Sequence, residues 1–279
     1  MDTFKCTVQM IIKRPGVMVI FSLVLLAYSI AGYFNPIPAI LLGLSSITNG
    51  SVFESVVSYL QILTDSKIIP VLIISVLAVI LIASLVIALF LSGYFYSLNN
   101  TITGKKKARR EYVEGLKRYF SRVLLITLRV LLFGFLFVVF MMVATIPAAV
   151  VTRAALSGNQ EVAFAAVFVD ILTIGVLFFG FMFFRAYMFF WYPAAISCEK
   201  GFFITAKRVV DRCFWLVLRT FLIFDVVLIA FEYAMLKIGN NPITLIVGWI
   251  FRTVFFVLYI NYIFVTYKKT EKAALKKHS

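Results

Sequence analysis

Histidine is almost absent from this sequence, because the only one, His278, stands next to the last residue. A serine-type catalytic triad or a zinc site built on histidine therefore has almost nothing to work with. The sequence also has no Gly-Lys-Ser/Thr phosphate loop and no GxGxxG fingerprint, which excludes nucleotide chemistry by these motifs. We expect no enzymatic activity, no metal site and no cofactor.

Cysteine is also scarce, with three residues at Cys6, Cys198 and Cys213. No two of them have CxxC spacing, which argues against a redox or zinc motif. All three fall in segments that we expect on the cytoplasmic side, where thiols stay reduced. The sequence therefore predicts no disulfide framework.

Charge is sparse as well: charged residues make up 14% of the chain, against about 25% in a soluble domain, and hydrophobic residues make up 63%. A water-soluble fold of 279 residues could not bury so much apolar surface. Uncharged runs of roughly 20 residues are typical of membrane-spanning helices, and they do not fit the alternating pattern of a membrane β-barrel. The sequence predicts an all-α, polytopic membrane bundle of six transmembrane helices, at 15–34, 69–98, 122–149, 164–194, 214–237 and 243–267.

The first of these runs allows a second interpretation. A basic pair precedes it, and Ser29-Ile30-Ala31 resembles a signal-peptide cleavage site. Cleavage there would leave five spans with the same orientation. We favour a retained span, because the apolar run continues through Tyr33 and Phe34 without a polar region.

Positive charge is distributed unevenly along the chain, whose formal net charge is +15. Twenty Lys and Arg residues lie in the N-terminus, the 104–122 loop, the 199–213 loop and the tail. The other side holds Lys67, Arg153 and Lys237. The positive-inside rule then places both termini in the cytoplasm. Because topology already explains the basic loops, we expect anionic headgroups of a cell membrane as their partner and no nucleic acid.

The two basic loops contain similar elements 90 residues apart. Apolar residues with helical spacing form one face of 112–123 and of 202–213. Their cations coincide too, since Lys117, Arg118, Arg122 and Arg129 correspond to Lys207, Arg208, Arg212 and Arg219. We interpret this as a duplication within one membrane domain, 1–279, in which each unit is a cytoplasmic amphipathic interface helix followed by a helical hairpin. The pseudo-repeat units are 1–98, 104–194 and 199–267, followed by a basic tail, 268–279. Convergence under shared amphipathic constraints is the alternative, which explains the four aligned cations less easily.

Two further stripes have helical spacing. At the N-terminus, Phe4, Val8, Ile11 and Ile12 form a stripe that Pro15 ends. On the outer side, 52–63 makes another, which predicts a helix that caps the bundle, and Asn49-Gly50-Ser51 is a formal glycosylation acceptor.

Charged side chains within the spans mark candidate functional positions, because each costs about 2.5–3.5 kcal/mol at the bilayer centre on insertion scales. We expect an intramembrane charge cluster of Asp225, Glu232 and Arg252, in which Arg252 pairs with Glu232 or Asp225. Asp170 either joins this cluster or faces the outer water. A proton or ion relay through the carboxylates is the alternative.

The remaining cations of the spans lie near the inner leaflet. Arg129 and Arg219 are expected to snorkel to the interface as anchors, and Arg185 is expected there too. The alternative is a basic inner pocket that binds lipid headgroups or another anion. Its candidate contacts are Arg122, Arg129, Arg212, Arg219, Lys117, Arg118, Lys207 and Arg208.

The stretch PAAISCEKGFFITAKRVVDR, 193–212, resembles a segment that follows the fourth helix in prokaryotic six-helix membrane families. These families are similar to the membrane domain attached to some glycerophosphodiester phosphodiesterases. The resemblance is carried by Glu199, Gly201, Ala206, Lys207 and Arg208. The catalytic domain of the phosphodiesterases has no counterpart here, so the resemblance implies a prokaryotic cell membrane and an accessory or transport-related role.

Three functions are compatible with these patterns. We favour a non-enzymatic scaffold or transport-associated component, whose partners are membrane lipids and a further membrane protein. An ion or small-solute carrier using Asp225, Glu232 and Arg252 is the first alternative, because transporters often combine repeats with intramembrane charges. The second is a lipid-binding or lipid-moving protein that uses the basic inner pocket.

Overall fold

Helices form every regular element of the residues that the computed structural model describes, which are 3–33, 68–156, 160–198, 201–239 and 241–275. They are α1 (Thr3–Lys13), α2 (Pro15–Tyr33), α5 (Ile68–Ile102), α6 (Glu111–Leu156), α7 (Gln160–Phe189), α8 (Trp191–Ser197), α9 (Phe202–Ile238) and α10 (Pro242–Leu275). The expected all-α class is confirmed. The stripe at 52–63 and the acceptor at 49–51 lie outside the described residues.

Five helices are long and apolar enough to cross a membrane: α5, α6, the α7–α8 segment, α9 and α10. The pair α1–α2 adds a sixth if it is counted as one span with a bend of 101°. α2 alone has 19 residues, or about 28 Å of helix, close to the roughly 30 Å of a hydrocarbon core. The described helices thus provide five to six spans by length and composition, and a count of six stays a prediction.

A sharp elbow joins α1 to α2. Pro15 has no N–H for a continuous helix and begins α2 at the position where proline is favoured. Between the two helices, the N–H of Arg14 donates to Met10 O at 3.0 Å, and its carbonyl accepts from the N–H of Val17 at 3.1 Å. The break expected at Pro15 is confirmed, and it places the Arg14 side chain at the inside of a corner.

The apolar stripe of α1 points away from the rest of the protein. Phe4 is 72% exposed and Ile12 is 71% exposed, whereas Cys6, Thr7 and Met10 are buried. A short helix with an outward apolar face beside membrane spans is typical of an interfacial helix. α1 therefore packs on the protein through a different face from the one its hydrophobic pattern marks.

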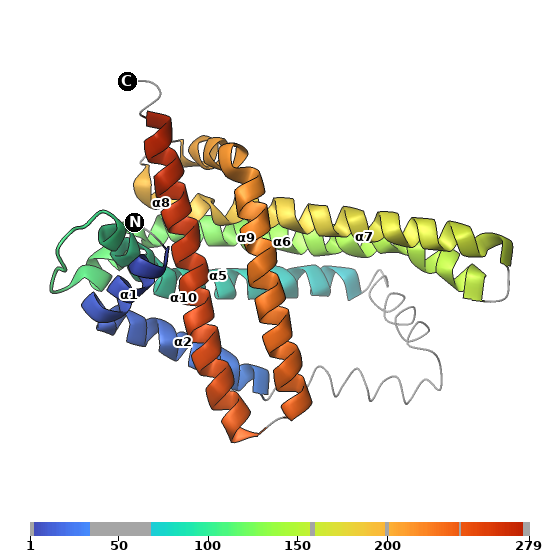
Figure 1. Ribbon diagram of the computed structural model, residues 1–279, viewed down its shortest axis with the longest axis horizontal. Helices are drawn as coiled ribbons and strands as arrows, with labels where there is room; N and C mark the ends of the chain where they lie inside the picture. The colour runs from blue at the N-terminus through green and yellow to red at the C-terminus, as the bar shows by residue number, and fades with distance from the viewer. Residues whose placement is uncertain (1–2, 34–67, 157–159, 199–200, 240, 276–279) are drawn as a thin grey trace.

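The two expected amphipathic segments are the first parts of long helices. The segment 112–123 forms the first turns of α6, which is 46 residues long in all. α9 bends at Cys213, where φ is −123°, so its basic first part runs in a different direction from its apolar part (Figure 1). The 90-residue duplication stays a prediction.

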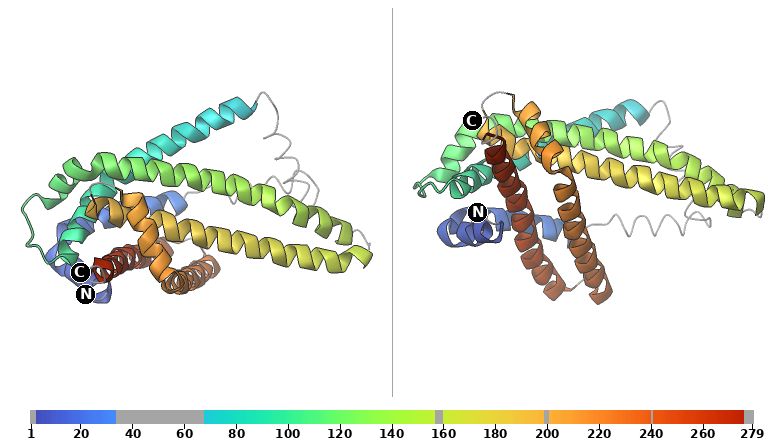
Figure 2. Two further views of the ribbon diagram at one scale, coloured as in Figure 1. Left: turned by 90° about the horizontal axis from the view of Figure 1, so that it is seen from above. Right: turned by 45° about the horizontal axis from the view of Figure 1, so that its top comes forward.

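The hairpins α6–α7 and α9–α10 diverge from a common end. In Figure 1, α6 and α7 lie along the horizontal direction, whereas α9 and α10 run steeply downward, and Figure 2 shows the same divergence. The two hairpins thus pack against one another mainly near this common end. Side chains far from the common end are apolar and exposed, such as Phe164 at 84% and Ile229 at 68%. In lipid such surfaces need no protein partner, because tails are as apolar as the side chains.

A reciprocal glycine–tyrosine contact brings α5 and α6 together. A Cβ atom added at Gly93 would lie 2.6 Å from the Tyr112 ring, and one added at Gly115 would lie 2.5 Å from Tyr96 Cβ. The Tyr96 hydroxyl donates to Glu114 Oε1 at 3.0 Å. Each glycine thus leaves room for a ring of the other helix, which holds the start of α6 against the end of α5.

Candidate functional site

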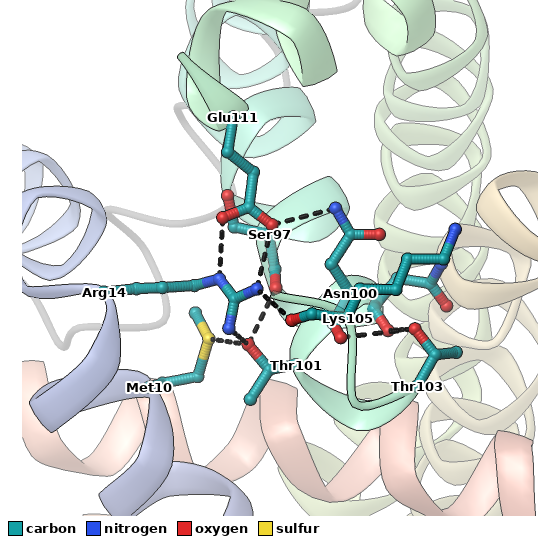
Figure 3. Close-up of polar contacts among 9 residues, drawn as sticks. Met10, Arg14, Ser97, Asn100, Thr101, Thr103, Lys105 and Glu111 are labelled. Atoms are coloured by element: carbon teal, nitrogen blue, oxygen red, sulfur yellow. Dashed lines mark hydrogen bonds and ion pairs between the residues drawn. The ribbon is translucent and has the colours of Figure 1, made fainter. Parts of the chain in front are cut away.

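The elbow contains a buried ion pair between Arg14 and Glu111, drawn in Figure 3 and called the elbow pair below. Arg14 Nε donates to Glu111 Oε2 at 2.8 Å, and Nη2 donates to Oε1 at 3.0 Å. The two side chains are only 2% and 4% exposed. Two parallel bonds of this kind give a strong, directional contact. The pair joins the α1–α2 corner to the first turn of α6.

Residues of α5 and its C-terminal loop complete the elbow pair. Arg14 Nη1 donates to Thr101 Oγ1 at 2.6 Å, and Nη2 also donates to the carbonyl of Lys105 at 3.2 Å. The Asn100 amide donates to Glu111 Oε1 at 2.8 Å. With these contacts both charges are compensated and hydrogen-bonded, as burial requires.

A small cavity of about 330 Å³ lies beside the elbow pair and is called the lysine pocket. One wall of the pocket is the turn that follows α5. This turn contains Gly104, whose φ of 75° is the left-handed conformation common at the C-terminal end of a helix. Lys5 and Lys13 come from α1 and Lys105 comes from the loop after α5, whereas Arg14 is already compensated by Glu111. The lining consists of Lys5, Gln9, Lys13, Arg14, Thr101, Ile102, Gly104 and Lys105.

A second ion pair joins α7 to α9. Arg185 Nη1 donates to both oxygens of Asp225, at 2.7 and 2.6 Å, and Nη2 donates to the Tyr259 hydroxyl at 2.8 Å. The guanidinium also lies 5.0 Å from the Phe181 ring centroid and 5.1 Å from that of Phe221. Arg185 is therefore not the surface anchor that its position near the end of a span suggested. It is buried because the common end of the hairpins closes around it.

This second pair forms part of the wall of a larger cavity of about 800 Å³, called the hairpin cavity. Helices α5, α7, α8, α9 and α10 contribute to it, with mostly aromatic and aliphatic side chains. Its polar groups are the ion pair and the hydroxyls of Tyr192 and Tyr259. An apolar cavity with a few converging polar groups is the usual form of a small-molecule site.

A third ion pair joins α9 to α10. Arg252 Nε donates to Glu232 Oε1 at 2.8 Å, and Nη2 donates to Oε2 at 2.7 Å. Arg252 Nη1 also donates to Ser29 Oγ at 3.3 Å, and the Trp249 indole donates to the Ser22 carbonyl at 2.9 Å. Of the two pairings expected for Arg252, the one with Glu232 is confirmed. These contacts also hold α2 against α10.

The four residues expected as one charge cluster thus have different partners. Asp225 bonds to Arg185, whereas Glu232 bonds to Arg252. Asp170 accepts a hydrogen bond from the Thr152 hydroxyl at 3.0 Å, within the α6–α7 hairpin. The hairpin cavity is lined by Asp225 but not by the other three.

The eight basic positions predicted for anion contact lie on or near the surface. Arg122 Nη1 donates to the Ala195 carbonyl at 3.5 Å, and the Arg129 guanidinium lies 4.9 Å from the Phe203 ring centroid. Neither the lysine pocket nor the hairpin cavity is lined by any of the eight. The side chains of Lys117, Arg118, Lys207, Arg208, Arg212 and Arg219 are exposed.

Sequence reasoning missed the elbow pair, since Arg14 counted only as one of the cations that set the topology. A signal was present: Glu111 is an acid in the first turn of a helix, within a loop that holds eight cations. Its intrahelical environment alone would favour a carboxylate there, because helix N-termini attract negative charge. The partner 97 residues away could not be read from local spacing.

Comparison of the chain with protein-family models, with curated proteins and with solved structures gives no match. The fold and the contacts above define the class in physical terms. The described residues are helical, with five to six apolar helices of membrane-spanning length and three ion pairs that join different parts of the helical fold.

Proposed function

We propose that this chain is a non-enzymatic, multi-pass cell-membrane protein that binds anionic lipid headgroups at its cytoplasmic face and acts as a scaffold or accessory component. In this proposal α2 is the sixth span, and both termini are cytoplasmic. The observation that carries it is the lysine pocket, in which Lys5, Lys13 and Lys105 surround one cavity.

The geometry of α1 supports an anionic lipid as the ligand. Its packed face is buried in the protein, its apolar stripe is exposed, and Lys5, Gln9 and Lys13 line the lysine pocket. A helix with these three faces can lie in the plane of the membrane surface, with its apolar stripe among acyl chains. The lysines are then at headgroup depth, where each contributes about 1 kcal/mol of attraction to an anionic surface.

The elbow pair supports a defined site over a diffuse basic patch. Because Glu111 compensates Arg14, the carboxylate is not available to the lysines. The buried bond of Arg14 to Thr101 and its partly buried bond to the Lys105 carbonyl fix the two walls of the pocket relative to each other. Pre-organisation of this kind improves binding by lowering the entropy lost on association.

The carrier alternative receives less support from the geometry. Glu232 and Arg252 are engaged in two mutual hydrogen bonds, and the hairpin cavity that Asp225 lines is mainly apolar. A relay would need polar groups that water or ions can reach in succession. We therefore place lipid contact before ion transport.

The test is native mass spectrometry of the full chain with phosphatidylglycerol and phosphatidylcholine. The triple variant Lys5→Gln/Lys13→Gln/Lys105→Gln is expected to lose one phosphatidylglycerol adduct. Its affinity for this lipid should fall about tenfold, which corresponds to a loss of about 1.4 kcal/mol of binding free energy. The matched control is Lys106→Gln/Lys107→Gln/Lys117→Gln, which removes the same charge from exposed positions outside the pocket. Equal losses in both variants would show that the attraction is general and that the pocket is no site.

A further inference from the structure

The hairpin cavity has one polar end and a long apolar body. The polar end consists of Arg185, Asp225 and Tyr259, and the Asp225 side chain is its more accessible charge, at 23% exposure against 10% for Arg185. The apolar body extends along diverging helices, to Phe178 on α7 and Ile229 on α9. A ligand that matches both parts must be amphipathic.

The polar end has no net charge but keeps hydrogen-bonding capacity. The Arg185 guanidinium and the Asp225 carboxylate compensate each other at 2.6 Å. Both Asp225 oxygens accept from one nitrogen, whereas a carboxylate offers about four acceptor positions. The Tyr259 hydroxyl accepts from Arg185, so its own hydrogen can be donated to a ligand. A head group that both donates and accepts, without charge, fits this end.

We propose that the hairpin cavity binds a neutral amphipathic lipid whose hydroxyl head group donates to Asp225 and accepts from Tyr259, while its apolar body lies between α7 and α9. The volume of about 800 Å³ is within the roughly 300–1,000 Å³ of small-molecule sites. The site is separate from the lysine pocket. It rests on the proposed function only in requiring that these helices lie in a bilayer.

The same geometry disfavours an anionic lipid at this site. A phosphate placed at the polar end would approach the Asp225 carboxylate, and like charges in a desolvated site repel strongly. Arg185 does not offset this repulsion fully, because its positive charge is already compensated by Asp225 and its side chain is the less accessible of the two, at 10% exposure against 23%. The two sites therefore select opposite head groups: anionic in the lysine pocket and neutral in the hairpin cavity.

The experiment uses the full chain in phosphatidylcholine vesicles with a diacylglycerol probe that carries a photoactivatable diazirine in one acyl chain. The probe is expected to label peptides of α7, α9 and α10, and unlabelled dioleoylglycerol is expected to compete. The matched phosphatidic acid probe differs only by its phosphate and is expected to label these peptides about tenfold less. This ratio corresponds to a loss of about 1.4 kcal/mol of binding free energy.

A pair of neighbouring substitutions on α9 provides the control for folding. Val226 is exposed and lines the hairpin cavity, whereas Val227 is exposed and does not. Val226→Trp fills the cavity and is expected to abolish competable labelling, whereas Val227→Trp is expected to leave it unchanged. Equal labelling of both variants, or equal labelling by the two probes, would overturn the proposal and mean that ordinary bilayer lipid occupies the groove.

A charge change gives an independent readout. Asp225→Asn leaves Arg185 without its counter-charge, so the site should come to prefer the phosphatidic acid probe over the diacylglycerol probe. An unchanged preference in this variant, with the competable labelling retained, would contradict the assigned role of Asp225. Labelling in the variant Lys5→Gln/Lys13→Gln/Lys105→Gln should equal that of the parent chain, which separates failure of this site from failure of the lysine pocket.

Discussion

At the scale of single residues, Arg14 is a positive charge with only 2% of its side chain exposed. Such a charge is tolerated because Glu111 accepts two of its hydrogen bonds and Thr101 a third. Removing one partner of a buried pair leaves the other uncompensated, which costs about 3–5 kcal/mol. Glu111→Ala should therefore destabilise the protein by about that amount in thermal unfolding in detergent.

The control for this change is Glu114→Ala, on the same helix, because Glu114 is exposed and accepts only from Tyr96 in the described contacts. It should cost less than about 1 kcal/mol. Cys6 supplies a local readout, since burial raises the pKa of its thiol to about 12 and suppresses reaction with maleimide. Cys6 should become reactive in Glu111→Ala alone. Equal effects of the two substitutions would argue against the elbow pair as the stabilising contact.

At the scale of helices, Gly115 decides how closely α6 approaches α5. A Cβ there would lie 2.5 Å from Tyr96 Cβ, which is the root of a side chain and cannot move without its backbone. Gly115→Ala should thus destabilise by about 1–3 kcal/mol, despite the better helix propensity of alanine. Gly134→Ala on the same helix meets only the tip of Phe184, at 3.6 Å, and should be neutral or stabilising by up to about 1 kcal/mol. Chemical unfolding of both variants checks the sign, and two effects of the same sign would count against the tight contact.

The helices could be predicted from the sequence, but the contacts between them could not. Runs of apolar residues mark the spans, and Pro15 marks the elbow, because both signals are local. The Gly93–Tyr112 and Gly115–Tyr96 contacts depend on which helices are neighbours. The same holds for Arg185, whose position near a helix end suggested an interface anchor until the packing of α9 and α10 around it was known.

At the scale of the whole molecule, the contacts of Arg14 bear on the number of membrane crossings. The Arg14–Thr101 bond holds the start of α2 and the end of α5 at one end of the molecule. If α5 crosses a membrane, as its length and composition allow, its first residues lie on the opposite side. Under that condition the chain crosses again between residues 14 and 68, and α2, with 19 residues, is the described helix in that interval. The apolar runs of the sequence predict the same count and the positive charge predicts the orientation, whereas the long-range bond is an independent argument for the first crossing.

We therefore predict six crossings, with the N-terminus and the C-terminus on the same side. Both ends lie at the common end of the hairpins in Figure 2, and α6–α7 and α9–α10 each leave that end and return to it. Epitope tags before Met1 and after Ser279 should both be digested by protease in inside-out vesicles, whereas a tag after Gly239, in the α9–α10 turn, should be protected. If the two terminal tags differ in protection, the number of crossings is odd. In that case no crossing would separate Arg14 from Ile68, Arg14 and Thr101 would lie on opposite sides of the membrane, and the elbow pair could not form there.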